Sequence, residues 1–98
     1  MSHLPDGPLE RALCEKLLAR TRDELASMRS ALAERDFAAL VQLAHRLGGA
    51  AGALGLAALA DAAYALEKAG ERGDLPGVTA RFGLLERELE RTAALIGH

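Results

Sequence analysis

The sequence predicts an all-α fold, an up-down-up-down antiparallel four-helix bundle that forms a single domain over residues 1–98. Apolar residues recur at helical spacing in four successive segments, and no segment shows the two-residue alternation of a strand. The connections between these segments are short, which favours antiparallel neighbours. Residues 1–7, which include Pro5 and Gly7, are expected to form an irregular N-terminus.

The helix boundaries follow from capping residues. Helices are expected at about 8–34, 36–53, 56–69 and 75–96. Asp6, Asp36 and Asp74 can cap the first, second and fourth helices, because an aspartate side chain accepts hydrogen bonds from the free N–H groups of a first turn. Gly55 can end the second helix by adopting a positive φ.

The core is expected to consist of leucine and alanine, because half of the chain is hydrophobic and only 3% is aromatic. Residues from the last three apolar stripes are predicted to be buried together: Leu47, Leu54, Leu59, Leu66, Phe82 and Leu89. Cys14 lies within the stripe of the first helix and is interpreted as a small buried hydrophobe.

Composition argues against several classes of partner. The net charge is −2 and no basic block occurs, so nothing indicates nucleic acid. No apolar run reaches the length of a membrane span, and residues 1–8 lack the features of a signal peptide. No second His or Cys stands at ligand spacing near His45, so no metal site is expected. These features agree with a cytoplasmic protein.

His45 lies within a glycine-rich stretch, residues 44–55, that reads AHRLGGAAGALG. At about 100° per residue the imidazole points away from a leucine side that also holds Ala50. His45 is surrounded on its own side by Val41, Gln42, Gly48, Gly49 and Gly52. A glycine inside a helix costs about 1 kcal/mol relative to alanine. We interpret these glycines as giving a large partner access to His45, with close helix packing as the alternative.

Glu67 is the candidate partner of the imidazole. His45 lies ten residues before Gly55 and Glu67 lies twelve after it, so an antiparallel hairpin brings the two near each other. A carboxylate that accepts from Nδ1–H fixes the tautomer and leaves Nε2 as the nucleophile. The alternative is a solvated glutamate at a helix boundary.

These residues resemble a histidine-containing phosphotransfer (HPt) domain. The resemblance covers residues 44–55, followed by Leu59, the Leu66-Glu67 pair and the turn at 72–74. It implies a phosphorelay intermediate without kinase activity of its own. His45 would accept a phosphoryl group from a receiver-domain phospho-aspartate, or from a hybrid histidine kinase, and pass it to another receiver.

The resemblance also implies how the site is built. Glu67 would orient the imidazole, and the receiver would dock on a face around the histidine, formed by Val41, Gln42, Gly48, Gly49, Gly52 and Tyr64. The chain itself would bind no cofactor or metal, and the partner receiver would carry Mg²⁺. The domain is expected to act as a monomer.

The sequence departs from the family pattern at one position. HPt domains usually carry a lysine three residues after the histidine, where this chain has Gly48. Arg46 is a possible phosphate-proximal charge, although it lies about 100° around the helix from His45. Two alternatives stay open: a phosphate-independent module that docks on receiver or kinase domains, and a purely structural helical bundle or homodimer.

Overall fold

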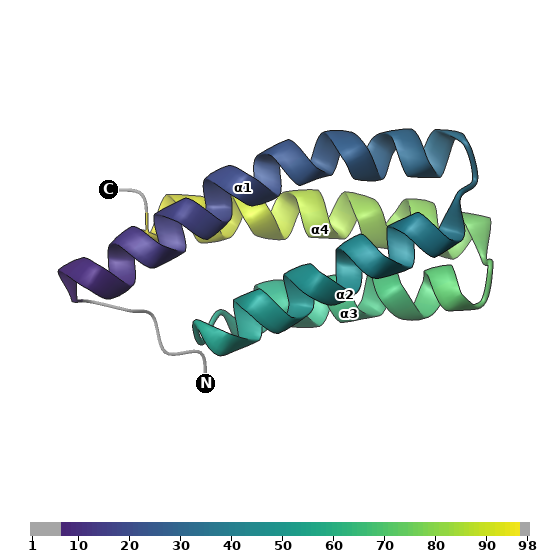
Figure 1. Cartoon of the computed structure of the whole chain (residues 1–98). Helices are drawn as coiled ribbons and strands as arrows, with labels where there is room; N and C mark the ends of the chain where they lie inside the picture. Colours follow the sequence, from purple (N-terminus) through teal and green to yellow (C-terminus); the bar gives the residue numbers. More distant parts are fainter. Residues whose placement is uncertain (1–6, 97–98) are drawn as a thin grey trace.

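The computed structural model describes residues 7–96 as four helices. They are α1 (Pro8–Ala33), α2 (Phe37–Ala53), α3 (Ala57–Glu71) and α4 (Leu75–Ile96). Residues 7–96 contain no strand, so the predicted all-helical class is confirmed for this part of the chain. Figure 1 shows the chain turning back on itself at each of the three connections.

The starts of α2 and α4 are capped by the predicted aspartates. Oδ1 of Asp36 accepts a hydrogen bond from the N–H of Ala39 at 3.1 Å. Oδ1 of Asp74 accepts one from the N–H of Gly77, also at 3.1 Å. Each carboxylate satisfies an N–H group that has no partner inside its helix, so these two residues set where the helices begin.

The other boundaries are set by backbone conformation. Gly55 has a φ of 76° and Gly73 a φ of 63°, which lets the chain leave α2 and α3 in tight turns. Arg35 has a φ of 54° in the connection after α1, a position that the sequence did not single out. The helix α1 begins after Gly7, and the predicted cap Asp6 lies outside the described residues.

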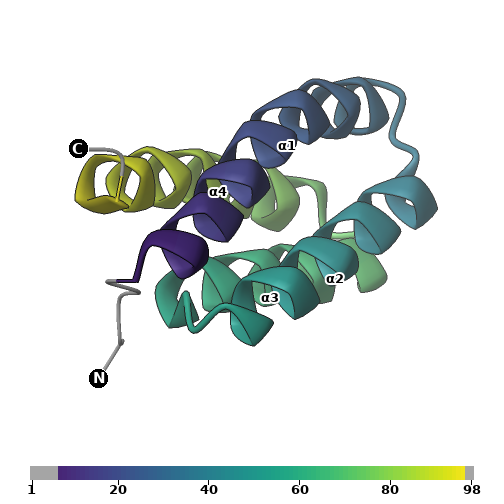
Figure 2. The same cartoon turned by 60° about the vertical axis from the view of Figure 1, so that its left-hand side comes forward.

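The helices form a ring of neighbours. Contacts join α1 to α2, α2 to α3, α3 to α4 and α4 back to α1. The pair α2–α3 is the most closely packed, and Figures 1 and 2 both show these two helices side by side. Within residues 7–96 the backbones of the diagonal pairs do not approach closely, although the side chains of all four helices share one core.

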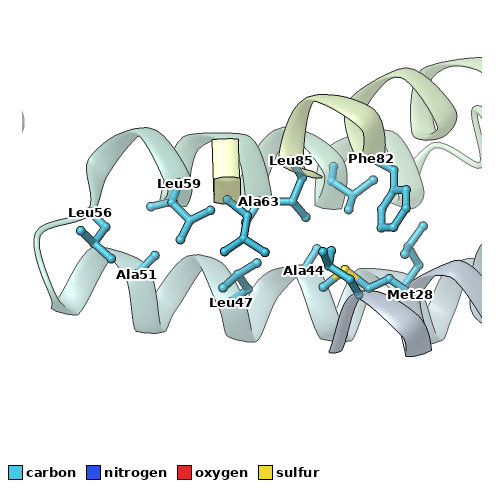
Figure 3. Close-up of a cluster of buried hydrophobic side chains, with 14 of the residues drawn as sticks. Met28, Ala44, Leu47, Ala51, Leu56, Leu59, Ala63, Phe82 and Leu85 are labelled. Atoms are coloured by element: carbon cyan, nitrogen blue, oxygen red, sulfur yellow. The ribbon is translucent and has the colours of Figure 1, made fainter. Parts of the chain in front are cut away.

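The core lies between the four helices and consists mainly of leucine and alanine. Figure 3 shows part of it, in which side chains from α2, α3 and α4 meet Met28 of α1. Most residues predicted to be central are buried: Leu47, Leu59, Leu66, Phe82 and Leu89. Cys14 is also fully buried, as predicted.

Leu54 was predicted to be buried with the core, but it is less buried than expected. Leu54 is the C-cap of α2 and is only partly buried, whereas Leu56 is 3% exposed. The turn at Gly55 redirects the chain, so that the residue after the turn enters the core. Figure 3 shows Leu56 at the end of the apolar cluster, near Ala51.

The buried face of α2 is also rotated relative to the prediction. Ala50 was expected on the core side and is exposed, whereas Ala44 is fully buried. The core side of the helix is therefore turned toward Gly48, which is buried as well. This rotation accompanies the close packing of α2 on α3. No helix of the described part is long and apolar enough to cross a bilayer.

Candidate functional site

His45 and Glu67 meet across the α2–α3 pair. Nδ1 of His45 lies 3.0 Å from Oε2 of Glu67. An ionised carboxylate can only accept a hydrogen bond, so Nδ1 is the donor and Nε2 carries the lone pair. The side chain of His45 is 68% exposed and that of Glu67 only 14%. A largely enclosed acceptor thus holds an exposed imidazole in one tautomer.

Two further contacts flank this pair, about one helical turn to either side. A Cβ built on Gly70 of α3 would lie 2.8 Å from Cγ2 of Val41. A Cβ built on Gly48 of α2 would lie 2.5 Å from Cε1 of Tyr64. Both distances are too short for an unshifted side chain. One glycine on each helix therefore allows α2 and α3 to approach closely on either side of His45.

Gly48 does not belong to the open face around His45, and this part of the prediction was wrong. The residue is buried, and the ring of Tyr64 occupies the space that its side chain would need. The helical wheel placed Gly48 beside His45 but could not show which side chain of α3 covers it. For this glycine the alternative interpretation, close helix packing, is the one that the structure supports.

The other two glycines, Gly49 and Gly52, lie on the exposed side of α2, as predicted. Gly49 and Gly52 are exposed, and a Cβ on either would meet nothing within 4 Å. Gln42 is exposed and Val41 is partly buried against α3. The exposed imidazole is thus bordered by backbone without side chains on one side and by small or polar residues on the other.

A shallow hollow adjoins the imidazole. It is lined by Val41, Gln42, His45, Arg46 and Glu67. Arg46 is exposed and forms no ion pair with any residue of 7–96, so its guanidinium is available to an incoming anion. Among the described residues no group of three His, Cys, Asp or Glu side chains could hold a metal ion.

Tyr64 borders the imidazole on the side away from this hollow. Its ring centroid lies 6.4 Å from that of His45, with the two planes inclined by 59°. The side chain is 39% exposed. Tyr64 was predicted to lie on the docking face, but neither its contact with Gly48 nor the contact of Gly70 with Val41 was predicted. The regular register of an antiparallel hairpin would have paired both glycines with their partners.

The sequence matches a protein-family model over most of its length. The model of the Hpt domain matches residues 12–95 of the 98-residue chain. No curated protein and no solved structure gave a significant match. The family model spans all four helices, including the hairpin that carries His45 and Glu67. Members of this family serve histidine phosphotransfer in two-component signalling and interact with receiver domains or kinases. The chain therefore belongs to the Hpt domain family.

Proposed function

We propose that this domain is a phosphorelay intermediate that carries a phosphoryl group on Nε2 of His45. It would receive the group from the phospho-aspartate of a receiver domain, or from a hybrid histidine kinase, and transfer it to a second receiver. The observation that carries the proposal is the contact between His45 and Glu67. It occupies one ring nitrogen with an acceptor while most of the imidazole stays exposed.

The chemistry of the step explains the carboxylate. The lone pair on Nε2 forms a bond to phosphorus as the bond between phosphorus and the aspartyl oxygen breaks. The aspartate leaves as a carboxylate with that electron pair. The imidazole keeps its proton on Nδ1 and therefore becomes cationic. Glu67, 3.0 Å from Nδ1, balances this positive charge, so it stabilises the phosphorylated ring as well as orienting it.

The partner supplies what the domain lacks. Phosphoryl transfer depends mainly on positioning and on neutralising charge around the phosphorus. In this proposal the receiver brings Mg²⁺ and a lysine of its own, and the exchange takes place in the cytoplasm. The domain contributes an oriented imidazole and an open surface at Gly49 and Gly52 on which the receiver docks.

The test uses receiver domains charged by a small-molecule phosphodonor in the presence of Mg²⁺. The chain is then analysed by intact mass at neutral or alkaline pH, and the modified residue is located by peptide fragmentation. We expect one phosphoryl group on His45 and none on the His45→Gln variant. Because His45 is exposed, this variant should keep the parent's free energy of unfolding.

One observation favours a second function. Position 48 carries no lysine, so the site has less positive charge than the family pattern provides. A receiver that binds the chain tightly yet never transfers its phosphoryl group would establish the phosphate-independent docking module instead. Transfer to His45 at any measurable rate would exclude it.

A further inference from the structure

The site is short of groups that can stabilise a phosphoryl group. A phosphoryl group carries close to two negative charges at neutral pH. Glu67 adds a negative charge within 3.0 Å of the ring, and Glu71 is exposed one turn further along α3. The hollow beside His45 offers only Arg46 as a cation. On the opposite side of the imidazole, Gly48 offers no side chain at all.

Tyr64 stands on that opposite side. Its ring covers Gly48, in the space where a side chain at position 48 would begin, and its centroid is 6.4 Å from the imidazole. Packing on Gly48 fixes the ring, while 39% of the residue is exposed. Among residues 7–96 the Tyr64 hydroxyl makes no hydrogen bond, so its O–H is available as a donor.

We infer that the Tyr64 hydroxyl donates a hydrogen bond to a non-bridging oxygen of the phosphoryl group on His45. This inference rests on the proposed function. The phenol oxygen and the phosphoryl oxygens each extend beyond their own rings, so rings 6.4 Å apart can place them at about 2.7 Å, the usual O–H···O distance. The phosphorus–nitrogen bond stays intact and the phenol keeps its proton.

Gly48 and Tyr64 act as a pair in this arrangement. A side chain at position 48 would displace the ring, because its Cβ would lie 2.5 Å from Cε1 of Tyr64. The glycine therefore makes room for the tyrosine, and the tyrosine supplies a neutral donor on the side where the chain lacks a lysine. The absence of a lysine at position 48 and the presence of Tyr64 are therefore linked, because the ring of Tyr64 fits only where position 48 has no side chain.

The test compares the parent with Tyr64→Phe, which keeps the ring and its packing on Gly48 but removes the donor. Each is equilibrated with the same charged receiver, and the fraction of phosphoryl group on His45 is measured, together with its rate of hydrolysis. Losing one hydrogen bond to the phosphoryl group should lower the His45-to-aspartate partition about three- to tenfold. Hydrolysis should accelerate by a similar factor, with the urea midpoint unchanged.

A second variant separates the hydroxyl from the ring. Gly48→Ala should displace the ring and lower the partition in the parent, yet have no further effect in the Tyr64→Phe background. Equal partition and lifetime in the parent and Tyr64→Phe would overturn the inference and leave the proposed function standing. A parent chain that takes no phosphoryl group on His45 from a receiver that binds it would instead overturn the proposed function, and the inference with it.

Discussion

The carboxylate of Glu67 lies 3.0 Å from Nδ1 of His45, and the two side chains differ sharply in exposure, 14% against 68%. The acceptor is therefore the fixed member of the pair. Because Glu67 belongs to α3, the orientation of an imidazole on α2 depends on how closely the two helices pack. Gly48 and Gly70, which allow that packing, thus support the site without touching a phosphoryl group.

Two substitutions of Glu67 distinguish its role in orienting the His45 imidazole from the effect of its negative charge. Glu67→Gln keeps an oxygen that accepts from Nδ1–H, so transfer from a charged receiver should stay within a few-fold of the parent rate. Glu67→Ala leaves the imidazole without a partner and should slow transfer by about ten- to a hundredfold, because misplaced nucleophiles react slowly. Both variants should keep nearly the parent's free energy of unfolding, since an ion pair with one exposed partner contributes only about 1 kcal/mol. An alanine variant that transfers at the parent rate would contradict the orienting role.

A substitution at Gly49 tests whether phosphoryl transfer requires open access of the receiver to His45. Gly49→Leu introduces a bulky side chain where a Cβ meets nothing within 4 Å, so the helix should fold and gain up to about 1 kcal/mol in stability. The same side chain should block the approach of a receiver to His45. Binding is measured by titration calorimetry and transfer by intact mass.

Gly83 of α4 provides the matched control for that experiment. A Cβ on Gly83 also meets nothing within 4 Å, and the backbones of α4 and α2 do not approach closely within residues 7–96. Gly83→Leu should gain similar stability while leaving receiver binding and transfer at parent levels. If Gly49→Leu also transfers normally, the glycines around His45 are not there for access.

Gly48 and Gly49 are adjacent in sequence but should respond differently to alanine. Gly49→Ala should stabilise the chain by about 1 kcal/mol, the usual helix-propensity gain. Gly48→Ala brings the same gain but forces the ring of Tyr64 to move, so its net effect should be smaller or negative. Urea unfolding of the two variants measures the difference, and equal stabilisation of both would contradict the packing of Tyr64 on Gly48.

The sequence allowed much of the fold to be predicted, because helix periodicity and capping are local properties. The four helices, the caps at Asp36 and Asp74 and the positive φ of Gly55 all follow from residues within a few positions of one another. The pairing of His45 with Glu67 needed only the position of one turn. The same turn pairs Gly48 with Tyr64, but the burial of Gly48 beneath that ring also depends on how far α2 rotates against α3, and that rotation is set by tertiary packing.

Cys14 should make the stability of the domain depend on pH in the alkaline range. Burial, assisted by the negative charge of Glu10, raises the pKa of the Cys14 thiol above its ordinary value of 9.0. Between the unfolded and folded pKa values the folded chain keeps a proton that the unfolded chain has lost. The free energy of unfolding contributed by this thiol is therefore fully present below pH 9.0 and decreases as the pH rises through the folded pKa.

The measurement is urea unfolding of the parent and of Cys14→Ala between neutral pH and the alkaline range above 9.0. The alanine variant should be less stable at neutral pH, because it leaves a small cavity in a fully buried position. Above the ordinary thiol pKa the parent should lose stability faster than the variant, by at most about 1.4 kcal/mol per pH unit for one proton. All other ionisable groups are the same in the two proteins, so their contributions cancel in the difference. Parallel profiles for the two proteins would show that the thiol ionises equally in the folded and unfolded chains.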